Sequence, residues 1–585
     1  MSSFAQATQP SLGSSRLASA ALFAVGLAPL LAMLLLVIRN WLPLPTWDEW
    51  ETPGEMFVSF CQGTLGLRDL IAQHNESRKF FPRLLYLALA QFGGWDVRKE
   101  MAFIFLSVCV TAALFGRLIG GMPGASARTA LLAWAVASFL CFSPVQFENF
   151  LWGVQVEVFF PGLAVLVIAW VNLSRLSVSR KAVVNGTLTL IATYTVAHGM
   201  LLWLLGIPLL ARGGSLRKNW TTYAAYMSCA AIASGAYFIG YTKPGYHPAF
   251  FGSGLNVLQL GHYLILWVGS YFNSAFIDPF AVGLVAVLIF LASLVSAVLV
   301  IRRTGDWRSF YAPILIAVYA CATAAITAVG RIGFGVEQAL NTRYRVFSLA
   351  FYLALVALLF ALYCTAVRRA SWPQRQLFHL AAGITALAAL LAWSACYLEG
   401  LPHLALAHER DLSRLRALEW IEVIPDNPDL DLIFPEREVL RERARVVRDH
   451  HLLRLPFVSA RIAQQLQHAA PPATGADHGQ MTTCRFDPED HNLVITGRAQ
   501  LPDGKRAPDC VLIGALEASG SYKPINVLEA VPRPNKKKGY AKFARAFKPT
   551  NVPPGEITIA AWAVDLGSEK LYPLAGTTRI SPGKR

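Results

Sequence analysis

Three carboxylates lie within four residues of the chain, at Asp48, Glu49 and Glu51, soon after an apolar run over residues 17–38. On a helix, Asp48 and Glu51 would share one face, whereas Glu49 would point elsewhere. Closely spaced carboxylates couple their titrations, so one of them can accept a proton near neutral pH. The segment therefore offers a general base, or a ligand for a divalent cation such as Mg²⁺ or Mn²⁺. A solvated acidic turn is the alternative interpretation.

A basic segment follows in the same predicted external loop, with His74, Arg78 and Arg83 just before the next apolar stretch. On a helix, His74 and Arg78 would lie one turn apart. Arginine binds phosphate through two parallel hydrogen bonds, so these cations suit a ligand that contains phosphate. The alternative is that they are basic residues that snorkel toward the interface at a helix start.

The second predicted external loop contains Glu148, Trp152 and Gln155, which a helix would place on one face. A carboxylate, a flat aromatic ring and an amide together can bind a sugar. An amphipathic turn at the membrane interface explains the same residues, so both interpretations remain open.

A late predicted external loop, residues 330–345, contains three arginines, including Arg343 and Arg345 on either side of Tyr344. Arginine is disfavoured on the external side of a membrane protein, so its presence there requires a reason. Binding of an anionic lipid headgroup supplies one, and Arg343 is the best single candidate. A local inversion of the predicted topology is the alternative.

The elements that position these residues are membrane helices. Of the 585 residues, 55% are hydrophobic and only 15% are charged, whereas soluble proteins have roughly 25% charged residues. The uncharged runs reach the ~17 to 25 residues that a helix needs to cross a bilayer. The sequence therefore predicts a polytopic membrane protein and excludes a cytosolic enzyme or a disordered chain. The net charge of +16 marks cytoplasmic loops and indicates no nucleic-acid partner.

The predicted spans are residues 17–38, 100–120, 127–143, 156–173, 219–241, 279–301, 309–329, 346–367 and 377–398. Basic residues flank 182–211 at both ends, which predicts two short helices with a break near His198, whose side chain could hydrogen-bond a substrate or the backbone. Residues 257–276 are expected to be external or re-entrant. About eleven crossings follow, with a cytoplasmic N-terminus and an extracytoplasmic chain after residue 398.

The predicted domain layout places the transmembrane domain at 1–398, a charged helical connector at 399–468, a linker at 469–480 and a further domain at 481–585. Within that last domain, five short apolar runs separated by Pro, Gly, Asn and Asp turns predict a soluble β-sandwich. Cys484 and Cys510 lie in this domain, and they could pair if it is extracytoplasmic.

Four short motifs match a known family: Asp48-Glu49, His74 to Arg83, Gly93-Gly94-Trp95 and Arg343-Tyr344. They resemble the GT-C superfamily of integral-membrane glycosyltransferases, which includes protein O-mannosyltransferases, aminoarabinose transferases and arabinofuranosyltransferases. The resemblance covers residues 15–398. It implies a mainly α, GT-C-like helix bundle and a general-base role for Asp48, with Glu49 as its neighbour. His74-Asn-Glu replaces the His-Pro-Pro type motif of the mannosyltransferases, which argues against protein mannosylation.

The resulting hypothesis is an inverting transfer of a sugar from a polyprenyl-phosphate donor to an envelope glycan or lipid acceptor, at the outer face of a bacterial inner membrane. Asp48 would be the base, and Arg343, Arg345, Arg83 and Arg78 would bind the donor phosphate. The sequence requires no cofactor, although a divalent cation at Asp48 and Glu49 is compatible with it. A transporter or flippase of lipid-linked saccharides, a polysaccharide polymerase or ligase that uses the late arginine-rich loop, and a non-catalytic envelope scaffold are the alternatives.

Overall fold

The computed structural model describes residues 12–210, 214–245, 248, 256–272, 277–369, 371–469, 477–487, 489–532, 539–549 and 556–580. The chain divides into two compact units. The first, here called the helical unit, comprises Met1–Trp41, Gly66–Tyr86 and Arg98–Ala405. The second, the C-terminal unit, comprises Leu42–Leu65, Leu87–Val97 and Leu406–Arg585.

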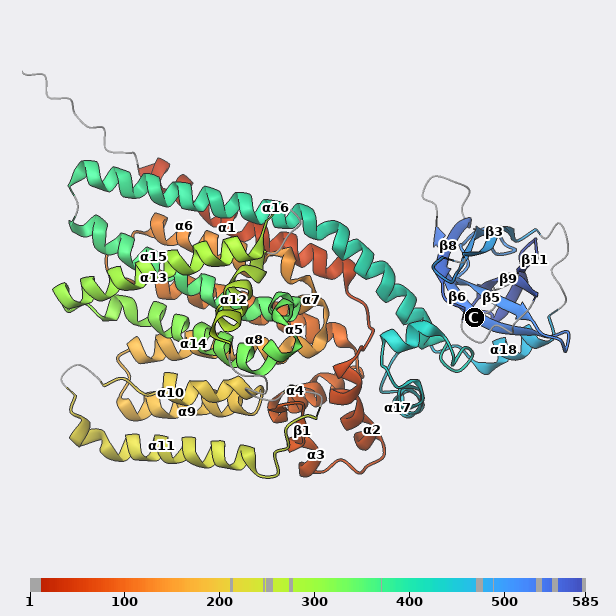
Figure 1. The fold of residues 1–585 in the computed structure, drawn as a ribbon, viewed down its shortest axis with the longest axis horizontal. Helices are drawn as coiled ribbons and strands as arrows, with labels where there is room; N and C mark the ends of the chain where they lie inside the picture. The colour runs from red at the N-terminus through yellow and green to blue at the C-terminus, as the bar shows by residue number, and fades with distance from the viewer. Residues whose placement is uncertain are drawn as a thin grey trace, which may run out of the picture. The chain divides into compact units, whose positions relative to one another are not determined.

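The helices, drawn in Figure 1, are α1 (Leu12–Asn40), α2 (Met56–Cys61), α3 (Leu67–Ile71), α4 (Phe80–Gln91), α5 (Val97–Gly120), α6 (Ala127–Cys141), α7 (Phe147–Leu151), α8 (Val156–Leu173), α9 (Val178–Thr193), α10 (Leu202–Leu205), α11 (Leu216–Phe238), α12 (Val257–Gly269), α13 (Pro279–Thr304), α14 (Arg308–Arg331), α15 (Arg345–Arg369), α16 (Trp372–Glu419), α17 (Arg437–Asp449) and α18 (Ala460–Gln467). Shorter helical turns include η1 (Trp50–Glu55), η2 (Pro144–Gln146), η3 (Gly153–Gln155), η4 (Ala197–Leu201), η8 (Thr342–Tyr344) and η9 (Pro428–Leu432).

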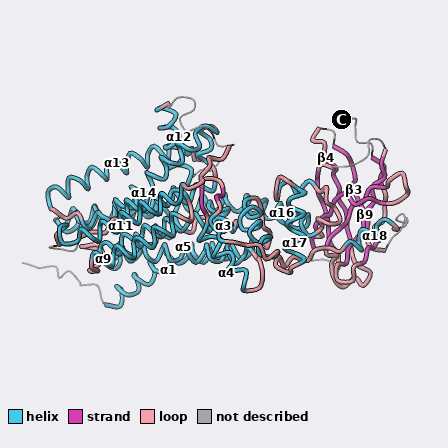
Figure 2. The backbone as a smooth tube through the Cα atoms, turned by 90° about the horizontal axis from the view of Figure 1, so that it is seen from below, coloured by secondary structure: helices cyan, strands magenta, loops and turns pink. Residues whose placement is uncertain are grey.

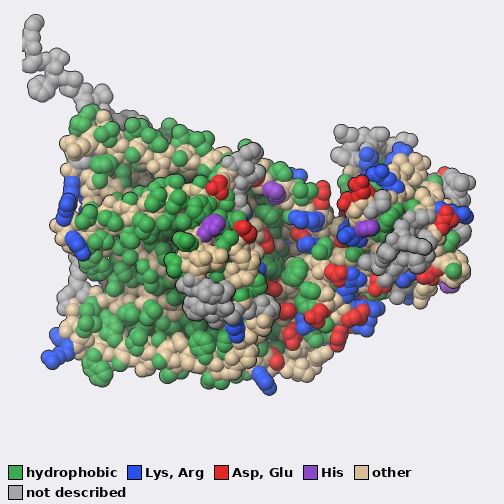
Figure 3. Space-filling model, in the orientation of Figure 1, with side chains coloured by type: hydrophobic (Ala, Val, Ile, Leu, Met, Phe, Trp, Pro, Cys, Tyr) green, Lys and Arg blue, Asp and Glu red, His purple; other side chains and the backbone are tan. Residues whose placement is uncertain are grey.

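Eight helices of the described residues are long and apolar enough to cross a membrane. These eight segments contain α1, α5, α6, α8, α13, α14, α15 and α16. Three of them extend beyond the single helix: α6 continues into α7, α14 continues to Phe334, and α15 is preceded by η8. Hydrophobic side chains cover the helical unit in Figure 3, and large ones such as Leu35, Leu284 and Leu387 are exposed. Exposed apolar surface on this scale suits a lipid environment. These helices are compatible with a multi-pass membrane protein, and the count of eleven crossings stays a prediction.

The predicted break within residues 182–211 is present in the backbone. Helix α9 ends at Thr193 and η4 begins at Ala197, so the helical stretch is interrupted just before His198. The other predicted spans coincide with single helices; for example, the run 100–120 lies within α5. These runs could be located because both length and lack of charge are local properties of the sequence.

Close helix packing in the helical unit depends on small residues. Phe23 of α1 stacks on Trp134 of α6 with ring centroids 5.4 Å apart, and Ser138 donates a hydrogen bond to the carbonyl of Gly26. A side chain at Gly26 would collide with the Trp134 ring. Glycine therefore allows α1 to approach α6 closely, as small residues do in membrane helix pairs. Helix α15 is buried along most of its length.

The C-terminal unit contains most of the strands, which Figure 2 shows in magenta. They are β3 (Gly479–Asp487), β4 (Asn492–Ala499), β5 (Cys510–Leu516), β6 (Tyr522–Glu529), β7 (Val531–Pro532), β8 (Ala541–Phe547), β9 (Ile557–Asp565), β10 (Lys570–Pro573) and β11 (Thr578–Ile580). One antiparallel sheet has the order β10-β9-β5-β6, with β11 also paired to β9, and the other has the order β3-β4-β8-β7. All five predicted runs form strands. Strands β3, β7, β10 and β11 were not predicted, and each lies at the margin of its sheet.

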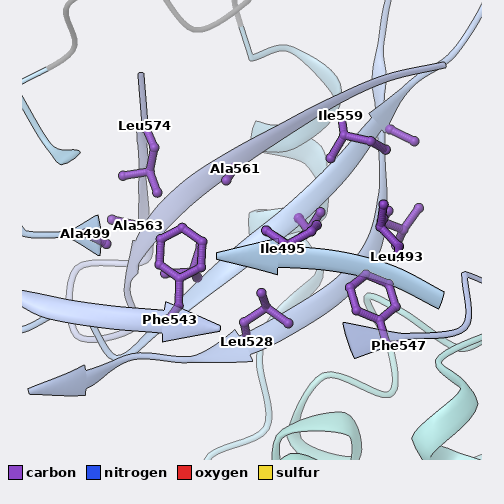
Figure 4. Close-up of a cluster of buried hydrophobic side chains, with 14 of the residues drawn as sticks. Leu493, Ile495, Ala499, Leu528, Phe543, Phe547, Ile559, Ala561, Ala563 and Leu574 are labelled. Atoms are coloured by element: carbon purple, nitrogen blue, oxygen red, sulfur yellow. The ribbon is translucent and has the colours of Figure 1, made fainter. Parts of the chain in front are cut away.

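Hydrophobic residues of both sheets share one core, which Figure 4 shows in close-up. Leu493 and Ile495 of β4 and Phe543 of β8 contribute from the four-stranded sheet, and Ile559 and Ala561 of β9 contribute from the five-stranded sheet. Alternate residues of β4 and β8 point away from this core, as the two-residue period of a strand requires.

The five-stranded sheet is buried on its other face as well. Trp420, Ile424 and Ile462, from the chain between α16 and the strands, pack against residues such as Leu512 and Trp562. Burial on both faces explains why β5 and β9 are almost continuously apolar.

Polar contacts hold the same region together. Arg416 forms an ion pair with Glu529 at 2.9 Å, and Asn427 hydrogen-bonds Asn526 at 3.3 Å. The predicted connector thus packs directly on the sheet. Of the predicted linker, residues 470–476 lie outside the described residues.

Residue 398 and the two cysteines of the last domain can be located in the structure. Residue 398, predicted as the end of the transmembrane domain, lies inside the uninterrupted helix α16, because composition changes there while helical structure continues. Cys484 and Cys510 are both free thiols. Cys484 packs against the core shared by the two sheets, whereas Cys510 belongs to the cluster on the other face of the five-stranded sheet, so the sheet separates them.

Candidate functional site

The hairpin formed by β1 (Gln73–His74) and β2 (Ser77–Arg78) lies in the helical unit and contains the first predicted basic residues. The buried Arg78 donates from Nε to the carbonyl of Tyr237 at 2.6 Å, from Nη1 to Ile71 at 3.0 Å and from Nη2 to Ile239. A cation at the C-terminal end of a helix also interacts favourably with the exposed carbonyls there. These contacts favour a role for Arg78 in holding the end of α11.

Arg83 and His74 are also buried. Arg83 donates from Nη1 to the carbonyls of Leu70 at 3.1 Å and Ala72 at 2.6 Å. The Nε2 atom of His74 lies 3.3 Å from the side-chain amide of Asn75. Both residues therefore make local contacts that fix the hairpin and the start of α4, and their predicted contact with a ligand stays a prediction.

Two ion pairs that the sequence analysis missed connect this hairpin with distant segments. Glu76 pairs with Arg331 at the end of α14 at 2.7 Å. Lys79 pairs with Glu157 in α8 at 3.0 Å, and its side chain is only 4% exposed. The sequence did contain one signal for these pairs. Each of the four residues is a charge near an apolar run, and a buried charge in a membrane protein requires a partner of opposite charge. The two pairs join three of the predicted external loops at one end of the helical unit.

The late arginine-rich loop reaches the same end of the helical unit. Asn149 of α7 donates a hydrogen bond to the carbonyl of Thr342 at 3.3 Å, and Arg345 donates to the carbonyl of Val145. Arg343 lies over the ring of the buried Tyr344, with its guanidinium carbon 5.7 Å from the ring centroid. The structure thus brings segments 144–151 and 341–345 into contact.

Several buried polar atoms in these two segments have no hydrogen-bond partner among the described residues. They are Nε of Arg343, Nε of Arg345, Oε1 of Gln146 and Oδ1 of Asn149. Arg345 is 8% exposed, and Gln146 and Asn149 are fully buried. Leaving such atoms unpaired costs free energy, more so when the group is charged. Cationic donors and amide oxygens on two contacting segments can bind an anion together with hydroxyl groups, so we take these four residues as the candidate functional site.

The predicted common face of Glu148, Trp152 and Gln155 is wrong. Helix α7 ends at Leu151, and Trp152 has an extended backbone before η3 begins at Gly153, so the three side chains are not on one helix. Glu148 is nevertheless close enough to Arg345 to act on it electrostatically, and Gln155 is buried.

His198 lies in η4 and contacts the helices at the centre of the helical unit. Its Nε2 atom is 3.4 Å from the hydroxyl of Tyr319, and its ring meets that of Phe347 edge to face at 4.7 Å. The hydroxyl of Ser77 accepts a hydrogen bond from the neighbouring Ala197 amide at 3.1 Å, which links η4 to the hairpin. The proposed contact of His198 with a substrate stays a prediction.

The acidic segment around Asp48 belongs to the C-terminal unit. Glu49, expected to point away from its neighbours, is the buried carboxylate of the three: its Oε2 accepts a hydrogen bond from the amide of Thr46 at 2.6 Å. A carboxylate in the first turn of a helix stabilises the exposed amides there. Asp48 is half-buried and Glu51 is exposed.

Residues of the same unit hold this acidic segment in place. The amide of Trp47 donates to the carbonyl of Ile433 at 2.6 Å, and Arg443 of α17 donates to the carbonyl of Trp50. Trp50 and Phe57 pack against Trp95 with ring centroids 5.2 and 5.1 Å apart. The sequence offered the tryptophans as a signal but gave no indication that α17 contacts them.

Within the described ranges, no three His, Cys, Asp or Glu side chains are arranged to hold a metal ion. A divalent cation bound by Asp48 and Glu49 therefore stays a prediction from the sequence.

No protein-family model matches the chain, and no curated protein matches its sequence.

Proposed function

We propose that this chain is an integral-membrane glycosyltransferase of the GT-C type. It transfers a sugar from a polyprenyl-phosphate donor to an envelope glycan or lipid acceptor, with inversion at the anomeric carbon. The proposal includes about eleven crossings, a cytoplasmic N-terminus in a bacterial inner membrane, and an external C-terminal domain whose two sheets form a β-sandwich.

The observation that supports this proposal best is that two buried arginine Nε atoms and two buried amide oxygens, on two segments in contact, have no hydrogen-bond partner among the described residues. Arg343 and Arg345 could bind the donor phosphate, because guanidinium groups recognise phosphate oxygens in a planar, two-point geometry. Gln146 and Asn149 could accept hydrogen bonds from sugar hydroxyls. A lipid-linked sugar phosphate presents both kinds of group.

In the proposed reaction, an acceptor hydroxyl attacks the anomeric carbon while the bond from that carbon to the phosphate oxygen breaks. Asp48 takes the hydroxyl proton, and the lipid phosphate leaves with the electron pair. The charge on the departing phosphate is stabilised by Arg343 and Arg345. Arg78 and Arg83 hold the hairpin that joins the loops of this end of the helical unit.

A second candidate function is a polysaccharide polymerase or ligase that uses the late arginine-rich loop without Asp48. One observation favours it: the arginines with unpaired Nε atoms and the amides beside them all belong to the helical unit, whereas Asp48 belongs to the C-terminal unit. In this reading the acidic segment has a structural role.

The substitution Asp48→Asn tests the base assignment. A deletion strain complemented with this variant should lack the envelope glycan that the wild-type gene restores, because losing a general base slows transfer by about 10²- to 10⁴-fold. Mass spectrometry of the envelope glycans measures the outcome. Asp69→Asn, the same chemical change in α3, is the matched control and should restore the glycan.

Equal amounts of each variant in the membrane fraction must be established by immunoblotting. Restoration of the glycan by Asp48→Asn would reject Asp48 as the base and favour the polymerase or ligase. An unchanged set of glycans in the deletion strain would reject glycosyl transfer altogether.

A further inference from the structure

The outward face of the four-stranded sheet carries an uncommon arrangement of charge. Its residues, here called the basic sheet face, are Gln480, Thr483, Arg485, Asp487, Asn492, Val494, Thr496, Arg498, Val531, Lys542, Ala544 and Ala546. They alternate along β4 and β8 with core residues such as Leu493 and Phe543, whose inward direction Figure 4 shows. The three cations are exposed, so the face is open to a partner.

Two cations of this face lie directly opposite each other. Arg498 of β4 pairs in register with Lys542 of β8. Like charges in this position destabilise a sheet. Neither of them, nor Arg485, forms an ion pair with any residue that the structure describes, so the repulsion between Arg498 and Lys542 is not offset by a carboxylate of that part of the chain.

Protection of a sheet edge does not explain these residues. Lysine is often placed on edge strands to prevent aggregation. Strands β4 and β8, however, are the two central strands in the order β3-β4-β8-β7. General solubility does not require two like charges in one cross-strand pair either. An anionic partner that binds both cations would remove the repulsion.

The rest of the face indicates what kind of anion fits. Arg485 pairs with Val494, four residues along β4 from Arg498, so it lies about 13 Å from the opposed pair at ~3.3 Å per residue. Gln480, Thr483 and Thr496 offer amide and hydroxyl groups, while alanines on β8 keep the face shallow. A partner must therefore be extended, anionic and rich in hydrogen-bonding groups.

We propose that the basic sheet face binds an extended anionic polysaccharide, one that carries carboxylate or phosphate groups along its chain. Its anionic groups would contact Arg498, Lys542 and Arg485, and its hydroxyls would bind the polar side chains of the face. An anionic bilayer fits less well, because the face contains no aromatic residue, and interfacial surfaces are rich in tryptophan and tyrosine. The proposal does not depend on glycosyl transfer and can fail or succeed separately.

Full-length protein in phosphatidylcholine nanodiscs provides the test, with binding to polygalacturonate followed by biolayer interferometry. Wild-type protein should bind polygalacturonate and not neutral dextran of similar length, and binding should weaken when salt rises from about 50 to 300 mM because exposed charges are screened. The double variant Arg498→Ala/Lys542→Ala should bind at least tenfold more weakly. Thr496→Val, which keeps every charge, should weaken binding two- to fivefold.

The matched control is Lys505→Ala/Lys570→Ala, which removes two exposed cations of the same domain outside this face. It should bind polygalacturonate within twofold of wild type, and thermal unfolding of all variants should be compared. Unchanged binding by the Arg498/Lys542 variant, or an equal loss in the control, would overturn the proposal. Stronger binding of wild-type protein to phosphatidylglycerol vesicles than to polygalacturonate, lost in the same double variant, would assign the face to lipid instead.

Discussion

Arg343 and Arg78 show how differently two arginines of one end of the helical unit are used. Arg78 donates to three backbone carbonyls, whereas the buried Nε atom of Arg343 has no acceptor among the described residues. Stacking on Tyr344 keeps the Arg343 guanidinium in place without using its hydrogen bonds. Of the two, Arg343 is therefore the better candidate for binding a ligand.

Arg343→Ala should raise the apparent KM for the lipid-linked donor by roughly ten- to a hundredfold, because a hydrogen bond to a charged group contributes roughly 1.5–3 kcal/mol. Arg343→Lys should recover only part of this loss, since lysine keeps the charge but not the planar two-point geometry. Steady-state transfer assays on purified protein measure both. Arg302→Ala, an exposed arginine at the end of α13, is the control. An unchanged KM in Arg343→Ala would remove Arg343 from the donor site.

At the scale of elements, helix α17 positions the acidic segment. Arg443 donates to the carbonyl of Trp50, forms a 3.4 Å ion pair with Glu55 and lies over the ring of Phe434. Trp95 adds a backbone contact, because its amide donates to the carbonyl of Leu452 at 2.6 Å. A segment nearly 400 residues away in the sequence thus fixes the loop that contains Asp48.

Arg443→Ala should loosen residues 42–65 without unfolding the strands. Amide hydrogen exchange should accelerate in this segment, and the local free energy of opening should fall by about 1–3 kcal/mol, the cost of leaving a buried polar group unpaired. Mass spectrometry of peptides from 42–65 and from β4 measures both. Arg461→Ala is the control, because the Arg461 side chain is 81% exposed and forms only a 3.8 Å ion pair. Amide exchange in residues 42–65 of this variant should match that of the wild type. Equal exchange in Arg443→Ala and wild type would show that α17 does not hold the segment.

At the scale of the whole molecule, an ion-pair cluster should make the stability of the C-terminal unit depend on pH. In the C-terminal unit, Glu422 accepts ion pairs from Arg441, Arg445 and Arg448 at 3.1–3.2 Å. Burial raises the pKa of Glu422, but hydrogen bonds from Arg445 and Arg441 outweigh burial and leave this pKa below its ordinary value. The folded state therefore binds a proton at Glu422 less readily than the unfolded state does.

Because the folded-state pKa is lowered, Glu422 stabilises the C-terminal unit fully above the unfolded value of about 4.3, and this contribution disappears as the pH falls through the lower folded value. Calorimetry between pH 7 and 3 should show that Glu422→Gln lowers the unfolding temperature of this unit at pH 7 and has little effect near pH 3. Glu569→Gln, at the weak pair with Arg461, should change the unfolding temperature little at either pH. A Glu422→Gln effect that is the same at both pH values would contradict the assigned shift.

The sequence by itself determined which segments form helices or strands and, approximately, where many of these elements begin and end. Uncharged runs located the membrane-length helices, because a helix needs about 20 consecutive apolar residues to cross a bilayer. Alternation of apolar residues located five strands, because the two-residue period of a strand is visible within a short run of neighbouring residues. It also identified Arg343 and Arg345 as unusual, since an external arginine beside a membrane helix is visible from charge alone.

Tertiary structure alone decided which of the proposed residues meet. Asn149 contacts Thr342, and Lys79 pairs with Glu157, across distances in sequence that no local period records. It also decided that Arg78 uses its donors on backbone carbonyls and that Asp48 belongs to the C-terminal unit. The reason is physical: each hydrogen bond is assigned by competition among all groups brought close by folding, and a side chain's sequence neighbours do not reveal which acceptor is nearest.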